Sequence, residues 1–325
     1  IFLWFGFSFK AVLLSDINQV PKGFPKIVYP EGNELTVSRW KLGKRLFYDP
    51  ILSKDSSVSC ASCHSYSNAF SDTLTFSIGV EQKSGTRNAP TLANVAYHPY
   101  LTLDGGVPSL EMQVLVPIQD HLEFDFNIIK ISDRLLKDDS YFKMSMDAYG
   151  RYPDSYVITS ALACFERTLL SGNSKYDEFS RGDSSVYSKS ELNGKQLFFG
   201  KRANCTHCHS GFNFTNYALE NNGLSLHYED SGRMRITHNE EDRDRFKVPT
   251  LRNIALTAPY MHDGSIETLE MVIEHYSEGI QKHKNLNKAL TPIHFSTKEK
   301  QDLVAFLMTL SDEEFCTNKL FYNEK

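Results

Sequence analysis

The 325-residue chain is 41% hydrophobic and carries a formal net charge of −5 at pH 7. This length suits two modest domains with buried cores, and the negative charge argues against a nucleic-acid-binding protein. No stretch of the sequence approaches the roughly 18 consecutive apolar residues of a membrane-spanning helix.

The chain opens with an apolar, aromatic segment, IFLWFGFSFKAVLL, which lacks an initiator Met. We interpret residues 1–18 as the remainder of a secretory signal, which predicts export to the periplasm, with membrane association through the N-terminus as a variant of that prediction. A packed N-terminal strand is the alternative. A lipoprotein anchor would need a Cys after Leu14-Ser15, where this chain has Asp16.

Predicted helices follow at residues 36–47, 155–170, 189–199, 266–276 and 297–310, and strand signals are few and short. Two of these helices begin with a capping-box pattern, Ser188 to Glu191 and Ser296 to Glu299. The sequence therefore predicts a mostly α protein with long loops.

Four of the six cysteines belong to two CxxCH motifs, Cys60-Ala-Ser-Cys63-His64 and Cys205-Thr-His-Cys208-His209. In such a motif two thiols form thioethers to a haem, and the histidine that follows ligates the iron. A redox-active CxxC that happens to precede a His is the alternative, which a second copy makes much less attractive. The motifs predict two covalently bound haems c, with His64 and His209 as the proximal ligands of haem 1 and haem 2.

The two haem motifs lie in halves that repeat each other. Pro90-Thr-Leu-Ala-Asn-Val-Ala96 recurs as Pro249-Thr-Leu-Arg-Asn-Ile-Ala255, and Asp104-Gly105 recurs as Asp263-Gly264, each at an offset of 159 residues. This internal duplication predicts two cytochrome c-like haem domains, at residues 19–180 and 181–325, with the boundary in the polar, turn-rich stretch 172–187.

The duplication also allows the two iron sites to be compared. Leu269, Val272, Ile273 and Tyr276 fall on one face of a predicted helix. At the position of Tyr276 the first half has Pro117. A tyrosine can ligate iron through its oxygen, whereas a proline cannot. Haem 2 is therefore expected to be closed by Tyr276, and haem 1 is expected to be open to peroxide.

Other residues compete with Tyr276 for this role. His275 is the chief rival as the sixth ligand, although it lies about 100° round the helix, off the apolar face. Met261 and Met271 are weaker candidates, and Tyr276 itself could be a core aromatic.

These motifs resemble the bacterial di-haem cytochrome c peroxidase and MauG family over residues 35 to 310. The resemblance also rests on Leu46-Phe47-Tyr48-Asp49-Pro50, on Arg87-Asn88-x-Pro90-Thr91, and on the stretch from Val248 to Asn253. It implies that Glu123 is the distal carboxylate of the peroxidatic haem, with Gln113 beside it. It further implies a calcium ion between the domains, held by Asn88, Thr257 and Pro259.

Three departures from the family pattern bear on function. Peroxidases of the family that need reductive activation carry a distal His in the loop after the first CxxCH, but residues 65–97 contain no His. Those enzymes also have Met at the position of Tyr276, where Tyr is the MauG-like residue. Finally, Leu103 stands where the family usually has a Trp between the haems.

The favoured function is reduction of hydrogen peroxide at haem 1, with electrons delivered through haem 2 by a small redox protein, a cytochrome c or a cupredoxin. The first alternative is a MauG-like enzyme that oxidises side chains of a partner protein. A non-enzymatic electron carrier is a third reading, but it would need both irons capped. The sequence leaves the oligomeric state open, with a homodimer as one candidate, and leaves open whether Cys164 and Cys316 pair.

Overall fold

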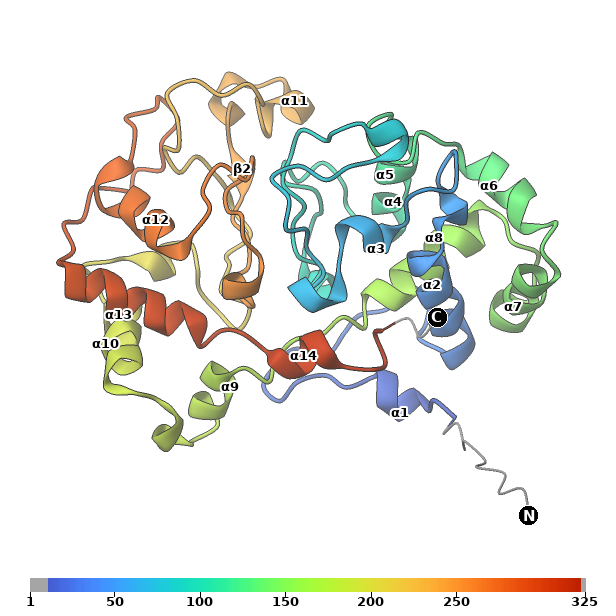
Figure 1. Cartoon of the computed structure of the whole chain (residues 1–325), viewed down its shortest axis with the longest axis horizontal. Coiled ribbons are helices and arrows are strands. Elements are labelled where there is room, and N and C mark those ends of the chain that lie inside the picture. The colour runs from blue at the N-terminus through green and yellow to red at the C-terminus, as the bar shows by residue number, and fades with distance from the viewer. Residues whose placement is uncertain (1–10, 323–325) are drawn as a thin grey trace, which may run out of the picture.

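The computed structural model describes residues 11–322, which form two helical lobes lying side by side (Figure 1). Most of the expected signal segment lies outside these residues. Within the described part of the chain, no helix is both long and apolar enough to cross a membrane. The mostly α fold with two cytochrome c-like domains is confirmed.

The N-terminal lobe is built around two crossing helices, α2 (Val37–Tyr48) and α8 (Ser155–Glu166). The helices approach so closely at Gly43 that a Cβ there would lie 1.9 Å from the carbonyl oxygen of Ala161. The other helices of this lobe are α1 (Leu14–Ile17), α3 (Cys60–Cys63), α4 (Leu110–Gln113), α5 (Leu115–Gln119), α6 (Ile128–Leu135) and α7 (Asp139–Tyr149).

The C-terminal lobe repeats this crossing with α10 (Lys189–Phe199) and α13 (Thr297–Met308). Here a Cβ on Gly194 would lie 1.8 Å from the carbonyl oxygen of Asp302. Two short strands, β1 (Leu219–Glu220) and β2 (Phe246–Lys247), pair antiparallel. The remaining helices of this lobe are α9 (Lys175–Ser180), α11 (Met234–Thr237) and α12 (Leu269–Glu274), which is followed by a π-helix at His275–Gly279. The last helix, α14 (Glu313–Thr317), follows α13 and packs on the N-terminal lobe.

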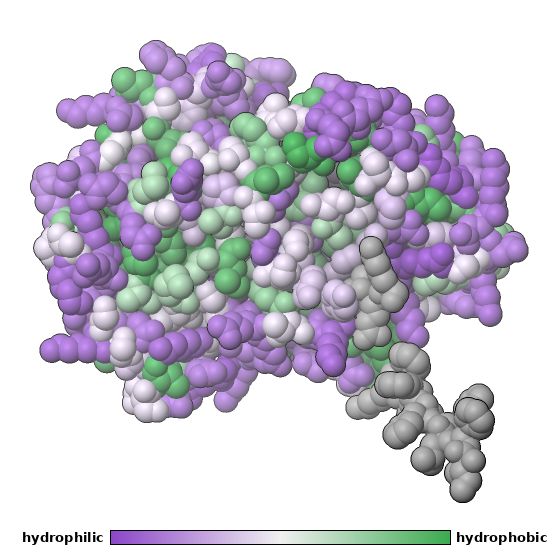
Figure 2. Space-filling model, viewed as in Figure 1, coloured by the Kyte–Doolittle hydropathy of each residue, from purple (hydrophilic) through white to green (hydrophobic). Residues whose placement is uncertain are grey.

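Each lobe has its own hydrophobic core, and the chain passes to the second lobe at α9 and back to the first at α14. Helix α9 packs Tyr176 and Phe179 against the second core. The chain returns to the first lobe at α14, whose Phe315 joins the first core together with Phe321 (Figure 1). Apolar side chains also gather on the visible face of the C-terminal lobe, whereas hydrophilic ones rim the molecule (Figure 2).

The five helices predicted from the sequence all form, and both capping boxes are present. Helix α12 begins at Leu269 rather than at residue 266, because Ile266 pairs with Tyr260 in an isolated β-bridge and Thr268 caps the helix. Helix α8 ends at Glu166 rather than at residue 170. Its following turn is held by Asn94, whose backbone N–H donates to the carbonyl of Leu169.

The lobes meet in a reciprocal way that reflects the duplication. The backbone N–H of Asn88 donates to the carbonyl of His262 (2.9 Å), and the N–H of Lys247 donates to the carbonyl of Leu103 (2.7 Å). Asn88 and Lys247 are related by the 159-residue offset, and so are Leu103 and His262. The interface therefore has an approximate two-fold symmetry, which makes differences between paired positions informative.

Candidate haem sites

The four motif cysteines are reduced and partly buried, and none of the cysteines in the described residues is in a disulfide. Burial raises the pKa of Cys63 and Cys208 to about 11 and that of Cys205 to about 12. Reactive CxxC motifs instead depress the pKa of a thiol. The environment of both pairs argues against a redox dithiol and fits thiols held for thioether attachment.

The two motif histidines are oriented in the same way. His64 Nδ1 lies 3.0 Å from the carbonyl oxygen of Phe70, and His209 Nδ1 lies 3.1 Å from that of Phe214. A histidine whose Nδ1 is held by a carbonyl presents Nε2 to a metal. Burial lowers the pKa of both rings, that of His209 to about 4, so both are neutral and able to ligate iron at pH 7.

Glu123 lies on the turn that follows α5, pressed against the loop at Gly79. The N–H of Val80 donates to the carbonyl of Glu123 (2.9 Å), and a Cβ on Gly79 would lie 2.0 Å from the carbonyl oxygen of Leu122. Burial, with a smaller contribution from Asp120, raises the pKa of Glu123 to about 7.

The position of this carboxyl relates it to the first haem motif. Glu123 adds to the raised pKa of both Cys60 and Cys63, so its carboxyl lies within electrostatic range of that cysteine pair. A carboxyl with a pKa near 7 is suited to accept and return a proton at neutral pH.

Gln113 ends helix α4, and its Oε1 atom is buried without a hydrogen-bond partner. Such orphaned buried atoms are rare in folded proteins and usually mark a missing ligand, water or ion. The unpartnered Oε1 atom is the kind of group that a bound polar ligand would satisfy.

Sequence reasoning missed Glu166, the last residue of α8. The Glu166 side chain is 8% exposed, and no hydrogen bond or ion pair holds it among the described residues. Burial raises its pKa to about 8, and the carboxyl in turn contributes to the raised pKa of Cys60. The position of Glu166 inside the apolar run ALACFERTLL is the feature of the sequence that could have indicated a buried carboxyl.

The corresponding residue at the second haem is apolar. Gly43 packs against Phe165, and Gly194 packs against Phe306, so Glu166 matches Leu307. Leu307 is buried in the second core. The first haem pocket therefore has a buried carboxyl that the second lacks.

At the second haem motif, Tyr276 faces the cysteine pair. Burial raises its pKa to about 12, with Cys208 and Cys205 adding to the effect, which places the hydroxyl within electrostatic range of both thiols. The amide Nδ2 of Asn222 lies 3.5 Å from this hydroxyl and 3.3 Å from the sulfur of Met261. Asn222 was not singled out from the sequence, and no motif marks it.

His275 is buried as well, contrary to the expected position off the apolar face. The backbone N–H of His275 still bonds to the carbonyls of Met271 and Val272, so the residue keeps its helical position, and the π-turn at His275–Gly279 begins only there. The His275 ring turns to the backbone, with Nε2 3.1 Å from the carbonyl oxygen of Asn222. That nitrogen is thus engaged, whereas the Tyr276 hydroxyl faces the cysteines.

Comparison with known proteins agrees with this geometry. The model of the di-haem cytochrome c peroxidase family matches residues 38–185, and the cytochrome c model matches residues 192–311. The methylamine utilization protein MauG of Methylorubrum extorquens is 37% identical, over 88% of this chain and 82% of its own length. The chain belongs to the di-haem cytochrome c peroxidase and MauG family.

Other relatives in the family carry different names. The cytochrome c551 peroxidase of Nitrosomonas europaea is 35% identical, over 89% of this chain and 83% of its own length. The crystal structure of a MauG-like protein associated with microbial copper homeostasis superposes with a TM-score of 0.88 at 32% identity, covering 93% of this chain and 97% of that one. The protein is an oxidoreductase of the peroxide-dependent di-haem type.

The residues that the family resemblance assigns to calcium lie on both sides of the lobe interface. Asn88 donates its amide to the carbonyls of Leu74 (3.1 Å) and Thr75 (3.3 Å). Its backbone bond to His262 brings it against the loop that carries Thr257 and Pro259. No group of three His, Cys, Asp or Glu able to hold a metal ion exists within residues 11–322.

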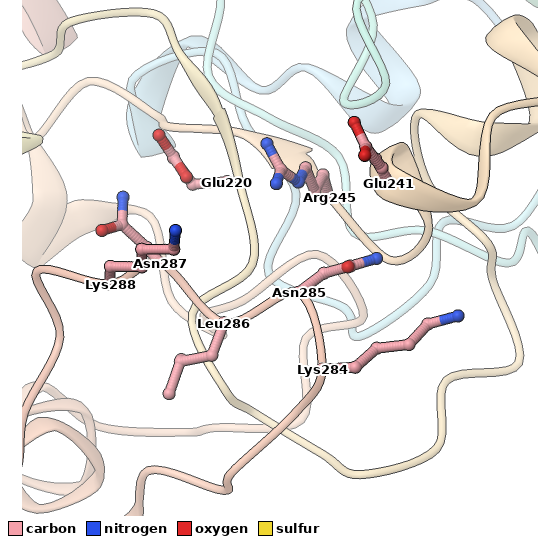
Figure 3. Close-up of a pocket in the computed structure, with 8 residues that line it drawn as sticks. All are labelled: Glu220, Glu241, Arg245, Lys284, Asn285, Leu286, Asn287 and Lys288. Atoms are coloured by element: carbon pink, nitrogen blue, oxygen red, sulfur yellow. The ribbon is translucent and has the colours of Figure 1, made fainter.

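An open surface pocket of about 520 Å³ lies outside the haem sites (Figure 3). Its walls carry both signs of charge, including Glu220, Arg245 and Lys284. Glu220 adds to the burial-raised pKa of Cys208, so this pocket lies on the haem 2 side of the protein. Its polar walls do not suit a flat apolar macrocycle.

Proposed function

We propose that this protein is a di-haem c-type peroxidase. It reduces hydrogen peroxide to water at an open haem in the N-terminal domain and receives electrons through the haem of the C-terminal domain from a small cytochrome c or cupredoxin. The observation that carries the proposal is the asymmetry of the two sites. The part-buried Glu123 carboxyl, with its raised pKa, and the unpartnered Oε1 atom of Gln113 lie in the lobe of the first haem motif, whereas Tyr276 lies in that of the second.

In this proposal Cys60, Cys63 and His64 hold haem 1, and Cys205, Cys208 and His209 hold haem 2. When bound, haem 1 supplies an iron that binds peroxide and relays electrons to it. Reduction of one peroxide takes two electrons and two protons and yields two water molecules.

The protein groups handle the proton movements. Glu123 in its carboxylate form accepts a proton from the bound peroxide and returns it to the oxygen that leaves as water. Gln113 can orient the peroxide by hydrogen bonding, but it has no proton to release at neutral pH.

We assign Tyr276 as the sixth ligand of haem 2. Its high pKa means that it ionises at neutral pH only when bound to a strong Lewis acid such as ferric iron. An anionic oxygen ligand stabilises ferric iron and so makes haem 2 hard to reduce.

Haem 1 needs no prior activation in this proposal. His98, the first histidine after the 65–97 loop, has its Nδ1 3.1 Å from Lys247 Nζ at the lobe interface. That contact ties His98 to the interface instead of to the first haem motif.

A calcium ion at Asn88, Thr257 and Pro259 belongs to the same proposal, because amide and carbonyl oxygens suit a hard cation. Export to the periplasm also belongs to it, on the strength of the apolar residues 1–14.

The experiment that tests the proposal starts from the fully oxidised protein. Electron paramagnetic resonance should show one high-spin and one low-spin haem, and peroxide should react without prior reduction. With reduced cytochrome c present, peroxide should then be consumed catalytically. Two low-spin haems in the resting protein would mean that haem 1 has a sixth ligand and would contradict constitutive activity.

A MauG-like oxidase is the second candidate, which the position of Tyr276 favours and Leu103 at the interface disfavours. It predicts that peroxide oxidises the haems while reduced cytochrome c is turned over poorly, and that a partner protein loses electrons instead.

A further inference from the structure

Arginines and acids from both lobes meet at the lobe interface. Asp104 is 3% exposed and is bound by Arg87 (2.7 Å) and by Arg235 (3.4 Å). Arg87 is also bound to Asp230 (2.5 Å). These acids are therefore already occupied by arginines.

Lys247 is the cation left over. It is 9% exposed, and its ammonium contacts only neutral atoms, His98 Nδ1 and the carbonyl oxygen of Tyr100, each at 3.1 Å. No carboxylate of the described residues lies within 4.0 Å of it. Burial lowers the pKa of Lys247 to about 8, and only the more distant Asp104 opposes that shift. Buried charges in folded proteins are normally paired.

Beside this unpaired cation, His98 has a buried N–H group without a hydrogen-bond acceptor. An ammonium has only donors, so His98 Nδ1 must accept from Lys247, and the proton of the neutral ring then resides on Nε2. His98 Nε2 is buried and has no hydrogen-bond partner. The ring is held against Tyr217, with centroids 5.1 Å apart.

This arrangement is specific to one side of the approximate two-fold interface. The position related to Lys247 by the 159-residue offset is Asn88, and that related to His98 is Thr257. The related site therefore has an amide and a hydroxyl where this one has an ammonium and an imidazole.

We propose that Lys247 and His98 form an interdomain anion site that receives a carboxylate of haem 2. Each haem carries two propionate groups, and their carboxylates are anions that come with the cofactor. Haem 2 is favoured because Lys247 is two residues before Pro249, whose carbonyl supports His209. The inference rests on the presence of two haems and is independent of the proposed peroxidase reaction.

The test measures the reduction potential of each haem in the holoprotein by spectroelectrochemistry, after haem staining has verified two haems per chain. Lys247→Met leaves the carboxylate without its cation, which favours the ferric state. The haem 2 reduction equilibrium should shift toward oxidation by about tenfold, equivalent to roughly 59 mV for a one-electron couple. Lys247→Arg should restore the potential, and Lys282→Met, which removes an exposed charge, should leave it unchanged.

His98→Phe is a second variant that keeps a flat ring beside Tyr217 but removes the donor, and it should lower the haem 2 potential by less. The carboxylate bending band of haem 2 in the resonance Raman spectrum should move in both variants. Unchanged potentials and an unmoved band, with both haems in place, would overturn the proposal. A shift confined to haem 1 would overturn the assignment to haem 2. If Lys247→Met does not fold, His98→Phe decides alone by the same criteria.

Discussion

Replacing Glu123 with Gln is the most direct perturbation of the proposed proton transfer. The amide keeps the size and hydrogen-bonding shape of the carboxyl but cannot accept a proton. General acid–base groups typically contribute about 10² to 10⁴ in rate, so the reaction with peroxide should slow by about 10²-fold or more. Both haems should remain bound, because Glu123 contacts the rest of the site only through its backbone and electrostatics.

The pKa of Glu123 determines how the rate of the peroxide reaction should depend on pH. Burial, and secondarily Asp120, raises this pKa to about 7. The carboxylate is the form that accepts the proton, so the rate of the wild-type protein should rise with pH through about 7. For a single ionisation at that pKa the change between pH 6 and 8 is about tenfold. In Glu123→Gln the rate should be low and independent of pH in this window.

Asp120→Asn is the matched control, since it removes the neighbouring negative charge but keeps an oxygen for its bond to the N–H of Leu122. The maximal rate should persist, and the midpoint of the pH profile should move below that of the wild type. Stopped-flow spectroscopy of the Soret band at several pH values measures all three proteins. A pH-dependent, undiminished rate in Glu123→Gln would refute the reasoning, because another group would then be moving the proton.

Four further predictions follow from the same geometry. Denatured protein should keep its haem colour on a gel, and its mass should exceed that of the bare polypeptide by two haems. In electron paramagnetic resonance, Tyr276→Phe should remove the low-spin ferric signal and leave the high-spin signal unchanged, whereas His275→Ala should leave both signals unchanged. The reverse outcome would assign the ligand to His275. Gln113→Ala should slow the peroxide reaction less than Glu123→Gln, measured in the same stopped-flow assay. Because the folded pKa of Glu166 is raised to about 8 by burial, its stabilisation is complete below the unfolded value near 4.5 and is lost as pH rises through 8. The melting temperature of the wild type should therefore fall more between pH 7 and 9 than that of Glu166→Gln.

Much of the fold could be predicted from the sequence because its signals are local. The capping boxes at Ser188 and Ser296 mark the starts of two helices without reference to the rest of the chain. The repeat at 159 residues predicted two similar lobes, and the backbone bonds of Asn88 and Lys247 reflect it.

Other features depend on tertiary contacts that have no local signature. His275 is buried because its ring meets the backbone of Asn222, a contact that a helical wheel of the local sequence does not include. Asn222 reaches Tyr276 across 54 residues of sequence. The meeting of His98 with Lys247 joins residues from different lobes, 149 positions apart. Such contacts follow from how the lobes pack, which a single sequence read along its length does not reveal.

The duplicated backbone explains why the side-chain differences carry functional weight. The hydrogen bonds that orient His64 and His209, and the glycine contacts at Gly43 and Gly194, are the same in both lobes. A scaffold that repeats so closely would bind two equivalent haems if the surrounding side chains also repeated. The side chains do not repeat, because the first lobe has Pro117 and Glu166 at the positions where the second lobe has Tyr276 and Leu307. We therefore expect the two haems to differ in ligand, in nearby charge and in access to peroxide, and in the proposed peroxidase reaction these differences would direct electrons from haem 2 toward haem 1.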